Sequence, residues 1–192
     1  MRLTDYINPY CWAVTIRNLA FDAGWLESKS FDLPVIAVGN LTVGGTGKTP
    51  HIEYIINLLK DEFEIATLSR GYRRKTKGFF KAGEDCSAIE VGDEPAQIKK
   101  KFPKITVAVD EKRVNGIEQL LKEEKRPDAI LLDDAFQHRY VVPGINIVLI
   151  DYNRPIYEDT LMPTGMLREP VSSIHRAHII IGTKGPNDIR PI

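Results

Sequence analysis

A glycine-rich segment that ends in Gly47-Lys48-Thr49 carries the clearest chemistry in this sequence. It occupies residues 38–50 and directly follows an apolar run at 34–38. A strand that leads into such a loop and then into a helix directs backbone N–H groups at one point, which suits a polyphosphate. Lys48 would reach the outer phosphates, and the Thr49 hydroxyl would hold Mg²⁺. The segment therefore predicts a user of nucleoside triphosphates.

One position departs from the usual pattern of this loop, because Thr42 stands where a glycine is usual. Gly44 and Gly45 are expected to supply the missing backbone freedom. A chance match is the alternative, but the expected strand, loop and helix follow one another in the required order.

Two adjacent carboxylates, Asp133 and Asp134, follow the apolar run 129–132. A P-loop enzyme holds its metal at such a place, since Mg²⁺ accepts one or two carboxylates together with phosphate oxygens. An acidic turn that caps a strand is the alternative.

Further along, Gln137 or His138 could orient a water, a hydroxyl or a phosphate. Structural hydrogen bonds in a polar loop explain these two residues nearly as well.

Arg70 and Asp93 are candidates for binding and for proton transfer. Arg70 follows a strand, so it would face the crevice where open α/β sheets place ligands, and its guanidinium suits an oxyanion. The charges at 73–75 are expected in a solvated loop.

Asp93 alone is best explained as a helix N-cap, with Pro95 in the first turn. Phosphoryl transfer to a hydroxyl needs a proton acceptor, however, and Asp93 is a candidate by elimination.

A turn-rich segment further along contains Arg168 and Glu169, which suit either a binding loop or a structural ion pair. His175 and His178 are expected to be structural, and His51 is expected on the surface.

Six short apolar runs, rich in Ile, Val and Leu, are typical of strands buried on both faces. They are residues 34–39, 64–68, 105–109, 129–132, 145–150 and 178–182. Apolar residues at helical spacing in 52–59 and 114–121 predict helices between them. The alternation predicts an α/β fold of the three-layer P-loop type, with a mostly parallel sheet flanked by helices.

The N-terminal segment, residues 1–30, predicts a helix with two apolar faces. Trp12 and Ile16 belong to one stripe, and Phe21 and Trp25 to the other. One face could pack on the domain while the other contacts a partner, and tryptophan suits a bilayer interface. Periodicity leaves a core helix, a dimer contact and a membrane contact open.

The composition fits one α/β domain with a sizeable core, since 43% of the 192 residues are apolar. The 26 basic residues balance 26 acidic ones, which gives no pull toward nucleic acid. With only Cys11 and Cys86 and no CxxC motif, a reducing cytosol is the simplest compartment. No apolar run is long enough to span a bilayer, and no protein partner is evident.

Five motifs together resemble the tetraacyldisaccharide 4′-kinase family, the lipid A 4′-kinases of Gram-negative bacteria. They are the glycine-rich segment 38–50, Ser-Arg-Gly-Tyr at 69–72, Gly-Asp-Glu-Pro at 92–95, Asp-Asp-Ala-Phe-Gln-His at 133–138 and Leu-Arg-Glu-Pro at 167–170. The N-terminal helix also resembles the membrane-associating helix of that family. The resemblance implies transfer of the γ-phosphate of ATP, with Mg²⁺, to the 4′-hydroxyl of an acylated glucosamine disaccharide at the cytoplasmic face of the inner membrane.

The resemblance also implies a role for each motif residue. Phosphates would be bound by Gly44, Gly45, Thr46, Gly47, Lys48 and Thr49. Mg²⁺ would be held by Thr49, Asp133 and Glu169. Asp93 would be the catalytic base, with Lys48 as the second catalytic residue. Residues near the phosphates or the substrate would be Arg70, Tyr72, Asp134, Gln137, His138 and Arg168.

The sequence departs from the family in two places. Ala135 stands where the family usually has glycine, which is tolerable if φ there is negative. Family members also continue into a second lobe that closes over the substrate and supplies a histidine partner for the catalytic aspartate, whereas this sequence ends at Ile192. We expect a fragment, with a helix at 1–30 and a kinase core lobe at 31–192, that binds nucleotide but has little or no activity.

Two other classes of function remain as alternatives. One is a nucleotide-dependent switch or partner-regulating P-loop ATPase, although Thr183-Lys184-Gly185-Pro186 lacks the aspartate of a guanine-reading element. The other is a soluble small-molecule P-loop kinase or ligase, which would have no evident use for a two-faced N-terminal helix.

Overall fold

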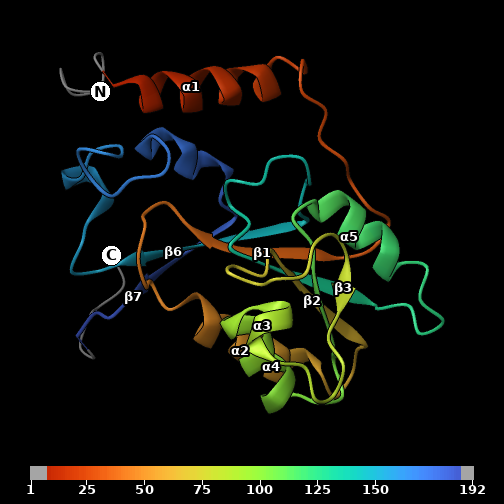
Figure 1. Ribbon diagram of the computed structural model, residues 1–192. Helices are drawn as coiled ribbons and strands as arrows, with labels where there is room; N and C mark the ends of the chain where they lie inside the picture. The colour runs from red at the N-terminus through yellow and green to blue at the C-terminus, as the bar shows by residue number, and fades with distance from the viewer. Residues whose placement is uncertain (1–7, 187–192) are drawn as a thin grey trace.

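A seven-stranded sheet in the order β3-β4-β2-β5-β1-β6-β7 forms the centre of the computed structural model, which describes residues 8–186 (Figure 1). The strands are β1 (Val35–Asn40), β2 (Ile65–Ser69), β3 (Phe80–Lys81), β4 (Thr106–Val109), β5 (Ala129–Asp133), β6 (Ile145–Asp151) and β7 (Ile179–Thr183). Every neighbouring pair is parallel except β3 with β4. The expected mostly parallel sheet is therefore confirmed, and the short β3 is an addition.

Helices cover both faces of this sheet and complete the three layers (Figure 1). They are α2 (Lys48–Leu59), α3 (Ala88–Val91), α4 (Asp93–Lys101) and α5 (Arg113–Leu120). Ile52 and Ile56 of α2 pack with Leu131 on one face. Ile117 of α5 packs with Leu132 on the other. Because Leu131 and Leu132 are neighbours on β5, their alternation explains why this strand reads as an unbroken apolar run.

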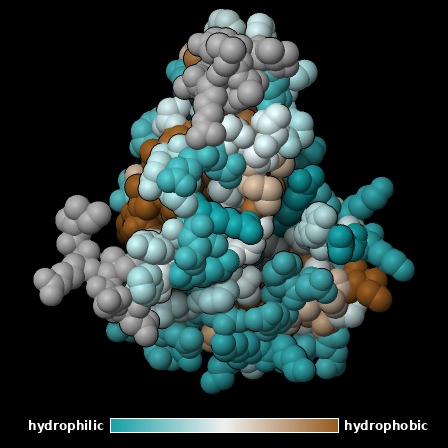
Figure 2. All heavy atoms as spheres, turned by 90° about the vertical axis from the view of Figure 1, so that its left-hand side faces the viewer, coloured by the Kyte–Doolittle hydropathy of each residue, from teal (hydrophilic) through white to brown (hydrophobic). Residues whose placement is uncertain are grey.

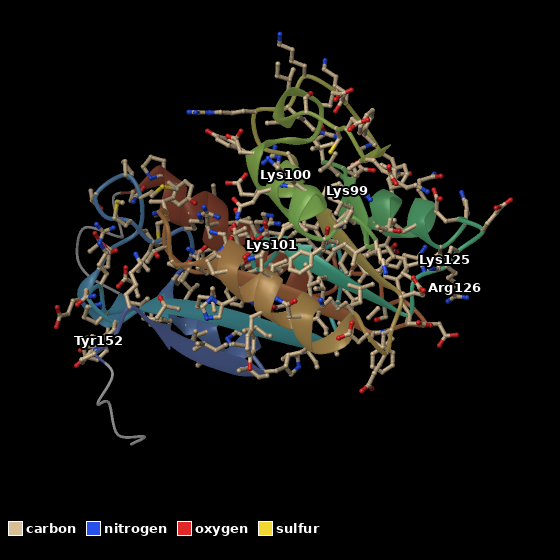
Figure 3. All side chains as sticks on the ribbon, turned by 90° about the horizontal axis from the view of Figure 1, so that it is seen from below. Lys99, Lys100, Lys101, Lys125, Arg126 and Tyr152 are labelled. Carbon is tan, nitrogen blue, oxygen red and sulfur yellow. The ribbon has the colours of Figure 1, made fainter. Side chains whose placement is uncertain are left out.

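The basic last turn of α4 fixes that helix to its surroundings (Figure 3). Lys99 is buried and donates to the carbonyls of Pro103 and Ile105 at 2.8 and 3.1 Å. Lys101 pairs with Glu53 of α2 at 2.6 Å. These bonds hold α4, so they also fix the position of Asp93 at its first turn.

The N-terminal helix α1 (Pro9–Asp22) lies apart from the sheet, above the loops that follow β5 and β6 (Figure 1). Asn8 caps it by accepting a hydrogen bond from the N–H of Tyr10 at 3.0 Å. Cys11 packs in a third apolar cluster with Phe136 and Leu167. In residues 8–186 no helix combines the length and apolar character needed to cross a bilayer.

The two faces of α1 differ from the sequence expectation. Trp12, Ile16 and Leu19 of the first apolar stripe are each more than half exposed. The face toward the domain is mixed instead, since Arg17 and Asn18 lie on it and make hydrogen bonds there. The apolar stripe is thus the face that the described domain leaves uncovered. Figure 2 shows that, on the side at the left of Figure 1, hydrophobic side chains reach a mostly hydrophilic surface in a few separate places.

Short 3-10 helices at Ile156–Glu158 and Val171–Arg176 lie in the long connection between β6 and β7. This connection carries the Leu-Arg-Glu-Pro motif. It lies between α1 and the sheet, so it joins the N-terminal helix to the loop after β1.

Candidate active site

The functional groups lie at one edge of the sheet because parallel strands present their carboxyl ends together. The order of strands along this edge decides which groups are neighbours. The glycine-rich loop follows β1, and Asp133 ends the adjacent β5. Arg70 follows β2, the next strand, and Arg113 begins the helix that follows β4. Four strands thus bring phosphate-binding, acidic and basic groups into one row.

The glycine-rich loop has the backbone geometry of a phosphate cradle. Gly44 and Gly47 have φ of 111° and 87°, in the region that glycine adopts without strain. The expectation for Gly44 is confirmed, whereas Gly45 does not use a positive φ. Inside the loop, Asn40 donates to the Thr46 hydroxyl at 2.9 Å.

Thr42 differs from the usual glycine because its segment is extended and paired. It forms an antiparallel bridge with Leu167. The N–H of Val43 donates to the Met166 carbonyl at 2.8 Å, and that of Arg168 donates to Leu41 at 2.7 Å. Any L-residue tolerates such a conformation, so glycine is not required there. The pairing also places Arg168 beside the cradle.

The loop after β5 presses directly on β1. A Cβ added at Gly39 would lie 2.6 Å from that of Phe136, so only glycine fits. Gln137 donates to the Asn40 carbonyl at 2.8 Å. Ala135 has a negative φ, which meets the condition for replacing the usual glycine.

The two adjacent aspartates have different electrostatic surroundings. Asp134 receives two bonds from Arg168 at 2.9 and 3.0 Å and lies 3.4 Å from the Lys48 ammonium. Burial opposes its ionisation, but Lys48 and Arg168 outweigh burial and lower its pKa. Asp133 is only 7% exposed, and burial together with the charge of Asp134 raises its pKa to about 6.

The donor set at Asp133 fits a hard divalent cation. Its Oδ1 is buried without a hydrogen-bond partner within residues 8–186. Such an atom is unfavourable unless a ligand satisfies it. No cluster of three or more His, Cys, Asp or Glu side chains suited to a metal occurs within the described part of the chain. Mg²⁺ does not need one, because it keeps several waters and binds one or two carboxylates plus phosphates. Asp133 and Thr49 suit that pattern.

Glu169 is held away from solvent by other groups. Its side chain is 1% exposed and forms an ion pair with Arg176. Asn18 of α1 donates to the same carboxylate oxygen, at 3.3 Å. Arg176 also stacks on the Phe136 ring, 4.3 Å from its centroid. The contacts therefore match the structural ion pair that the sequence left open, with Arg176 rather than Arg168 as partner, and a metal-binding role for Glu169 stays a prediction.

The motifs that contain Arg70 and Asp93 touch through their glycines. A Cβ at Gly71 would meet the Val91 carbonyl at 2.8 Å, and one at Gly92 would meet the Tyr72 carbonyl at 3.0 Å. Both glycines also have positive φ. The close contact sets the loop after β2 against the start of α4.

Asp93 is the first residue of α4 and is exposed, while Gly92 occupies the cap position without a side-chain bond. The expectation that Asp93 is the N-cap is therefore wrong. Its carboxylate carries no capping bond and remains available for another role.

The charges that follow Arg70 do not all lie in solvent. Arg74 has a side chain that is 2% exposed, pairs with Glu111 at 2.7 Å and donates to the Gly78 carbonyl at 2.6 Å. The solvated loop expected here is wrong for this residue, which instead organises the loop. Tyr72 is exposed, with the guanidinium of Arg73 5.2 Å from its ring centroid.

A pocket of about 400 Å³ lies between these groups and α1. We call it the arginine pocket, because four arginines line it: Arg17, Arg70, Arg113 and Arg168. Asp134, Gln137 and His138 line it as well. The structure thus brings together five of the six residues expected near the substrate, and leaves Tyr72 outside the lining.

Arg113 was not foreseen from the sequence. It is 3% exposed and donates to the carbonyls of Asp110 and Asp133 at 2.7 and 3.3 Å. Burial lowers its pKa to about 10, so it stays charged at neutral pH. Its Nε is buried without a partner among the described residues. Its position between the apolar run 105–109 and the helix expected at 114–121 was the available signal, but no role was assigned to that connection from the sequence alone.

Residues of α1 were also missed as parts of the site. Tyr10 lines the arginine pocket and donates to the Arg168 carbonyl at 2.9 Å. Arg17 donates to the Gln137 carbonyl at 2.8 Å. Both bonds span more than 100 positions of sequence, so periodicity could not reveal them.

The remaining histidines have structural contacts. His138 is packed against Tyr140, and burial lowers its pKa to about 4. His178 accepts a hydrogen bond from the N–H of Asn146 at 2.9 Å, and a ring nitrogen of His175 lies 2.6 Å from the Ser172 carbonyl. His51 is half-buried rather than on the surface, with Nδ1 2.8 Å from the Gly47 carbonyl.

The parallel sheet, the cradle after β1 and the carboxylates that end β5 define a P-loop kinase fold. The family model described as Tetraacyldisaccharide-1-P 4′-kinase matches residues 7–192. The chain belongs to this family, and the expected membership is confirmed.

Proteins named Tetraacyldisaccharide 4′-kinase are similar along the whole chain. The one from Phocaeicola vulgatus is 54% identical over 100% of this chain and 54% of its own length. The one from Bacteroides thetaiotaomicron is 53% identical over 100% of this chain and 52% of its own length. The chain thus spans about half the length of the curated relatives it matches.

A solved structure shares the fold. The crystal structure of LpxK from Aquifex aeolicus in complex with ATP is 39% identical, with a TM-score of 0.85 over 94% of this chain and 57% of that chain. The expected P-loop kinase architecture is confirmed.

Proposed function

We propose that this protein transfers the γ-phosphate of ATP to the 4′-hydroxyl of a tetraacyl glucosamine disaccharide 1-phosphate, a step of lipid A biosynthesis. Family membership and the names of the relatives support the reaction. The main observation that supports this reaction is that Asp134 is shared by the phosphate cradle and the arginine pocket. This carboxylate contacts Lys48 of the cradle and also lines the arginine pocket. A donor and an acceptor bound in these two places would meet beside it.

The residues of the cradle would bind the donor. Backbone N–H groups from Gly44 to Thr49 would receive the phosphates, and Lys48 would neutralise the outer ones. Thr49 and Asp133 would hold Mg²⁺, which neutralises phosphate charge when bound. Glu169 is kept as a further candidate for this metal only by resemblance.

Asp93 is proposed as the base that accepts the proton of the acceptor hydroxyl. It lies on the same edge as the cradle, in an exposed position without a capping bond. The contact of Gly92 with Gly71 sets it beside the loop of Arg70. A positioned base contributes about 10²–10⁴-fold to such a transfer.

The arginine pocket is proposed to bind the anionic part of the acceptor, with help from Gln137 and His138. Arg113 supports this use, because its buried guanidinium has no carboxylate as a hydrogen-bond partner within residues 8–186. Buried cations are normally paired, and a bound phosphate would pair this one. Arg70 would be a second contact for that group, and Tyr72 could meet the acceptor outside the pocket.

Peripheral association with the cytoplasmic face of the inner membrane is proposed as well. The apolar stripe of Trp12, Ile16 and Leu19 supports it, because these side chains are exposed on α1. Such a stripe suits the boundary between headgroups and acyl chains. Since the relatives are about twice as long, we propose that residues 31–192 act as a nucleotide-binding lobe beside a second, closing lobe.

The reaction is tested with labelled ATP, Mg²⁺ and the tetraacyl disaccharide 1-phosphate in detergent micelles. The full-length enzyme, which includes the second lobe, is expected to yield the labelled lipid, and its Lys48→Ala variant to lower the formation of that lipid about a hundredfold or more. Lys60→Ala is the matched control, since Lys60 lies just after the other end of α2. No labelled lipid from the full-length enzyme would refute the kinase proposal.

Asp93→Ala tests the base separately. A fall of kcat by about a hundredfold, with nucleotide affinity unchanged, is expected. Normal turnover would remove Asp93 from the mechanism without refuting the reaction.

The membrane association is tested by flotation with anionic vesicles, which is compared between wild type and Ile16→Glu/Leu19→Glu. Equal flotation of the two would refute a role of the apolar stripe.

A further inference from the structure

The phosphate cradle has two flanks, because β1 lies between β5 and β6 in the sheet and is parallel to both. The carboxylates that end β5 occupy one flank. On the other, Asn40 at the end of β1 pairs with Leu149 of β6, and β6 ends two residues later at Asp151. The turn that follows β6 therefore begins beside the cradle, on the side away from Asp133.

Arg154 is the basic residue of this turn. Its Nη1 atom lies 3.8 Å from the position that a Cβ would take at Gly44. Gly44 belongs to the cradle, where its φ of 111° bends the loop. The guanidinium of Arg154 is thus close to the backbone that would receive the phosphates of ATP.

The backbone on both sides of Arg154 is held in place. Its own N–H donates to the Asp151 carbonyl at 2.9 Å. On the other side, Ile156 is buried in the apolar cluster that also contains Leu41, the first residue after β1. These contacts fix the start of the Arg154 side chain relative to the end of β1 that carries the cradle.

The guanidinium of Arg154 is exposed and forms no hydrogen bond or ion pair with any of residues 8–186. The Asp151 carboxylate lies within range of its charge but is already paired with Lys184 at 2.9 Å. That carboxylate also accepts a hydrogen bond from the N–H of Asn153 at 3.1 Å. A fixed backbone with a free guanidinium suits the capture of an oxyanion, since the planar fork can donate two parallel hydrogen bonds.

Arg154 is separate from the arginine pocket, which it does not line. The arginines of that pocket, like Asp134, lie toward β5, and Lys48 is 3.4 Å from Asp134 on the same side. Phosphates bound in the cradle would therefore have Lys48 toward β5 and Arg154 toward β6. Cations on two sides neutralise the charge that is spread over phosphate oxygens better than a cation on one side.

We propose that Arg154 binds the outer phosphates of ATP, the β- and γ-phosphates, from the β6 side of the cradle. This inference rests on the proposed function, which supplies the nucleotide. Backbone N–H groups at the start of α2 suit the inner phosphates. Gly44 lies ahead of them in the loop, so a guanidinium beside Gly44 is placed for the outer ones.

The test measures the binding of ATP, ADP and AMP, each with Mg²⁺ and without acceptor, to the full-length enzyme and to its Arg154→Ala variant. The expected result is about tenfold weaker binding of ATP and of ADP, because a charge-assisted hydrogen bond to phosphate is lost. Binding of AMP is expected to stay unchanged, since AMP lacks both outer phosphates.

Arg126→Ala is the matched control. Arg126 is also an exposed arginine, but it precedes β5 and so lies at the opposite edge of the sheet. Figure 3 shows Arg126 and Tyr152, which belongs to the turn of Arg154, at opposite ends of the molecule. All three nucleotides are expected to bind Arg126→Ala as they bind wild type. Thermal unfolding without nucleotide is expected to be the same for both variants, because both side chains are exposed.

The outcomes separate this inference from the proposed function. Unchanged binding of ATP and ADP to Arg154→Ala overturns the inference. An equal loss for AMP, or a similar loss in Arg126→Ala, overturns it too, because neither would come from the outer phosphates. An Arg154-dependent affinity for ATP in an enzyme that phosphorylates no lipid would refute the kinase activity and leave the role of Arg154 standing.

Discussion

Two buried carboxylates, at the sheet edge and beneath α1, have opposite surroundings. The carboxylate of Asp133, at the end of β5, forms no ion pair with any of residues 8–186, and burial raises its pKa to about 6. Glu169 is even less exposed, yet it is paired with Arg176 and bonded to Asn18. A buried acid with its own cation belongs to the scaffold, whereas one without a partner indicates a place kept for a ligand.

The comparison extends to the regions around them. Around Glu169, Arg139 pairs with Asp22 and also donates to the Asn18 carbonyl at 2.9 Å, so charges on both sides of α1 are satisfied. Around Asp133, the Oδ1 atom and the Nε of Arg113 are buried without partners among residues 8–186. Among the same residues, Glu169 Oε1 and Asn18 Oδ1 are also buried without partners, so the two regions differ in their ion pairs: Glu169 has its own cation, whereas the Asp133 carboxylate has none.

The largest expected effect is on catalysis. Asp133→Asn keeps the shape of the side chain but removes the charge that a metal would use, which is expected to lower kcat about a thousandfold. Asp151→Asn is the control, since Asp151 is a buried aspartate at the end of the adjacent-but-one strand, paired with Lys184 at 2.9 Å. Steady-state phosphate transfer measures both. Similar losses in the two variants would contradict the distinction between paired and unpaired carboxylates.

The next effect is on stability. Glu169→Gln removes the buried charge that pairs with the half-buried Arg176, so the free energy of unfolding is expected to fall by about 3 kcal/mol. Glu53→Gln is the comparison, because its partner Lys101 is half exposed and the change is expected to be at most about 1 kcal/mol. Urea unfolding measures both. Unchanged stability together with a weakened Mg²⁺ dependence would instead make Glu169 a metal ligand.

A smaller effect is the pH dependence of stability in the absence of nucleotide and Mg²⁺. The pKa of Asp133 is raised to about 6 in the fold, against about 3.9 when unfolded. Its contribution is therefore fully present below about pH 4 and is lost as pH rises through about 6, by about 3 kcal/mol. Asp133→Asn is expected to be more stable than wild type above pH 7 and to match it near pH 4. Parallel profiles would refute the raised pKa.

The smallest effect concerns the link between α1 and the site. Tyr10→Phe removes the hydroxyl that donates to the Arg168 carbonyl, which is expected to lower stability by about 1 kcal/mol. Tyr157→Phe at an exposed position is expected to change nothing. Thermal unfolding measures both. A loss of acceptor affinity with unchanged nucleotide affinity would show that this bond also shapes the arginine pocket.

The sheet could be predicted because its strands are buried on both faces and therefore read as continuous apolar runs. All six runs became strands, and the cradle and the carboxylates lay at their carboxyl ends as expected. The short β3 was missed, since two residues paired at an edge leave no periodic signal. Asp93 as a cap was wrong because Gly92, with φ of 95°, takes the position before the helix.

The parts of the site that could not be predicted depend on contacts between distant segments. Arg17 and Tyr10 reach the loops after β5 and β6 only because α1 crosses them. Arg74 and Arg113 looked like ordinary charges, yet both are buried because loops from different strands close over them. The local sequence shows that such a side chain is polar and needs hydrogen-bond partners. It does not show which distant backbone carbonyls will accept those hydrogen bonds when the side chain is buried.

The close contact of Gly71 and Gly92 limits which substitutions this chain can accept. A side chain at either place would push apart the loop of Arg70 and the helix start of Asp93. At Gly92 a compensating change of side chain cannot make room, because the obstacles are backbone atoms of Gly71 and Tyr72. At Gly71 the Arg74 side chain is nearest, at 2.4 Å, but the Val91 carbonyl follows at 2.8 Å and would remain after Arg74 is exchanged. Substitutions that move the backbone on one side of this contact are therefore expected to require matching changes on the other side. New acceptor specificities are expected to arise first in the walls of the arginine pocket, where side chains can be exchanged one at a time.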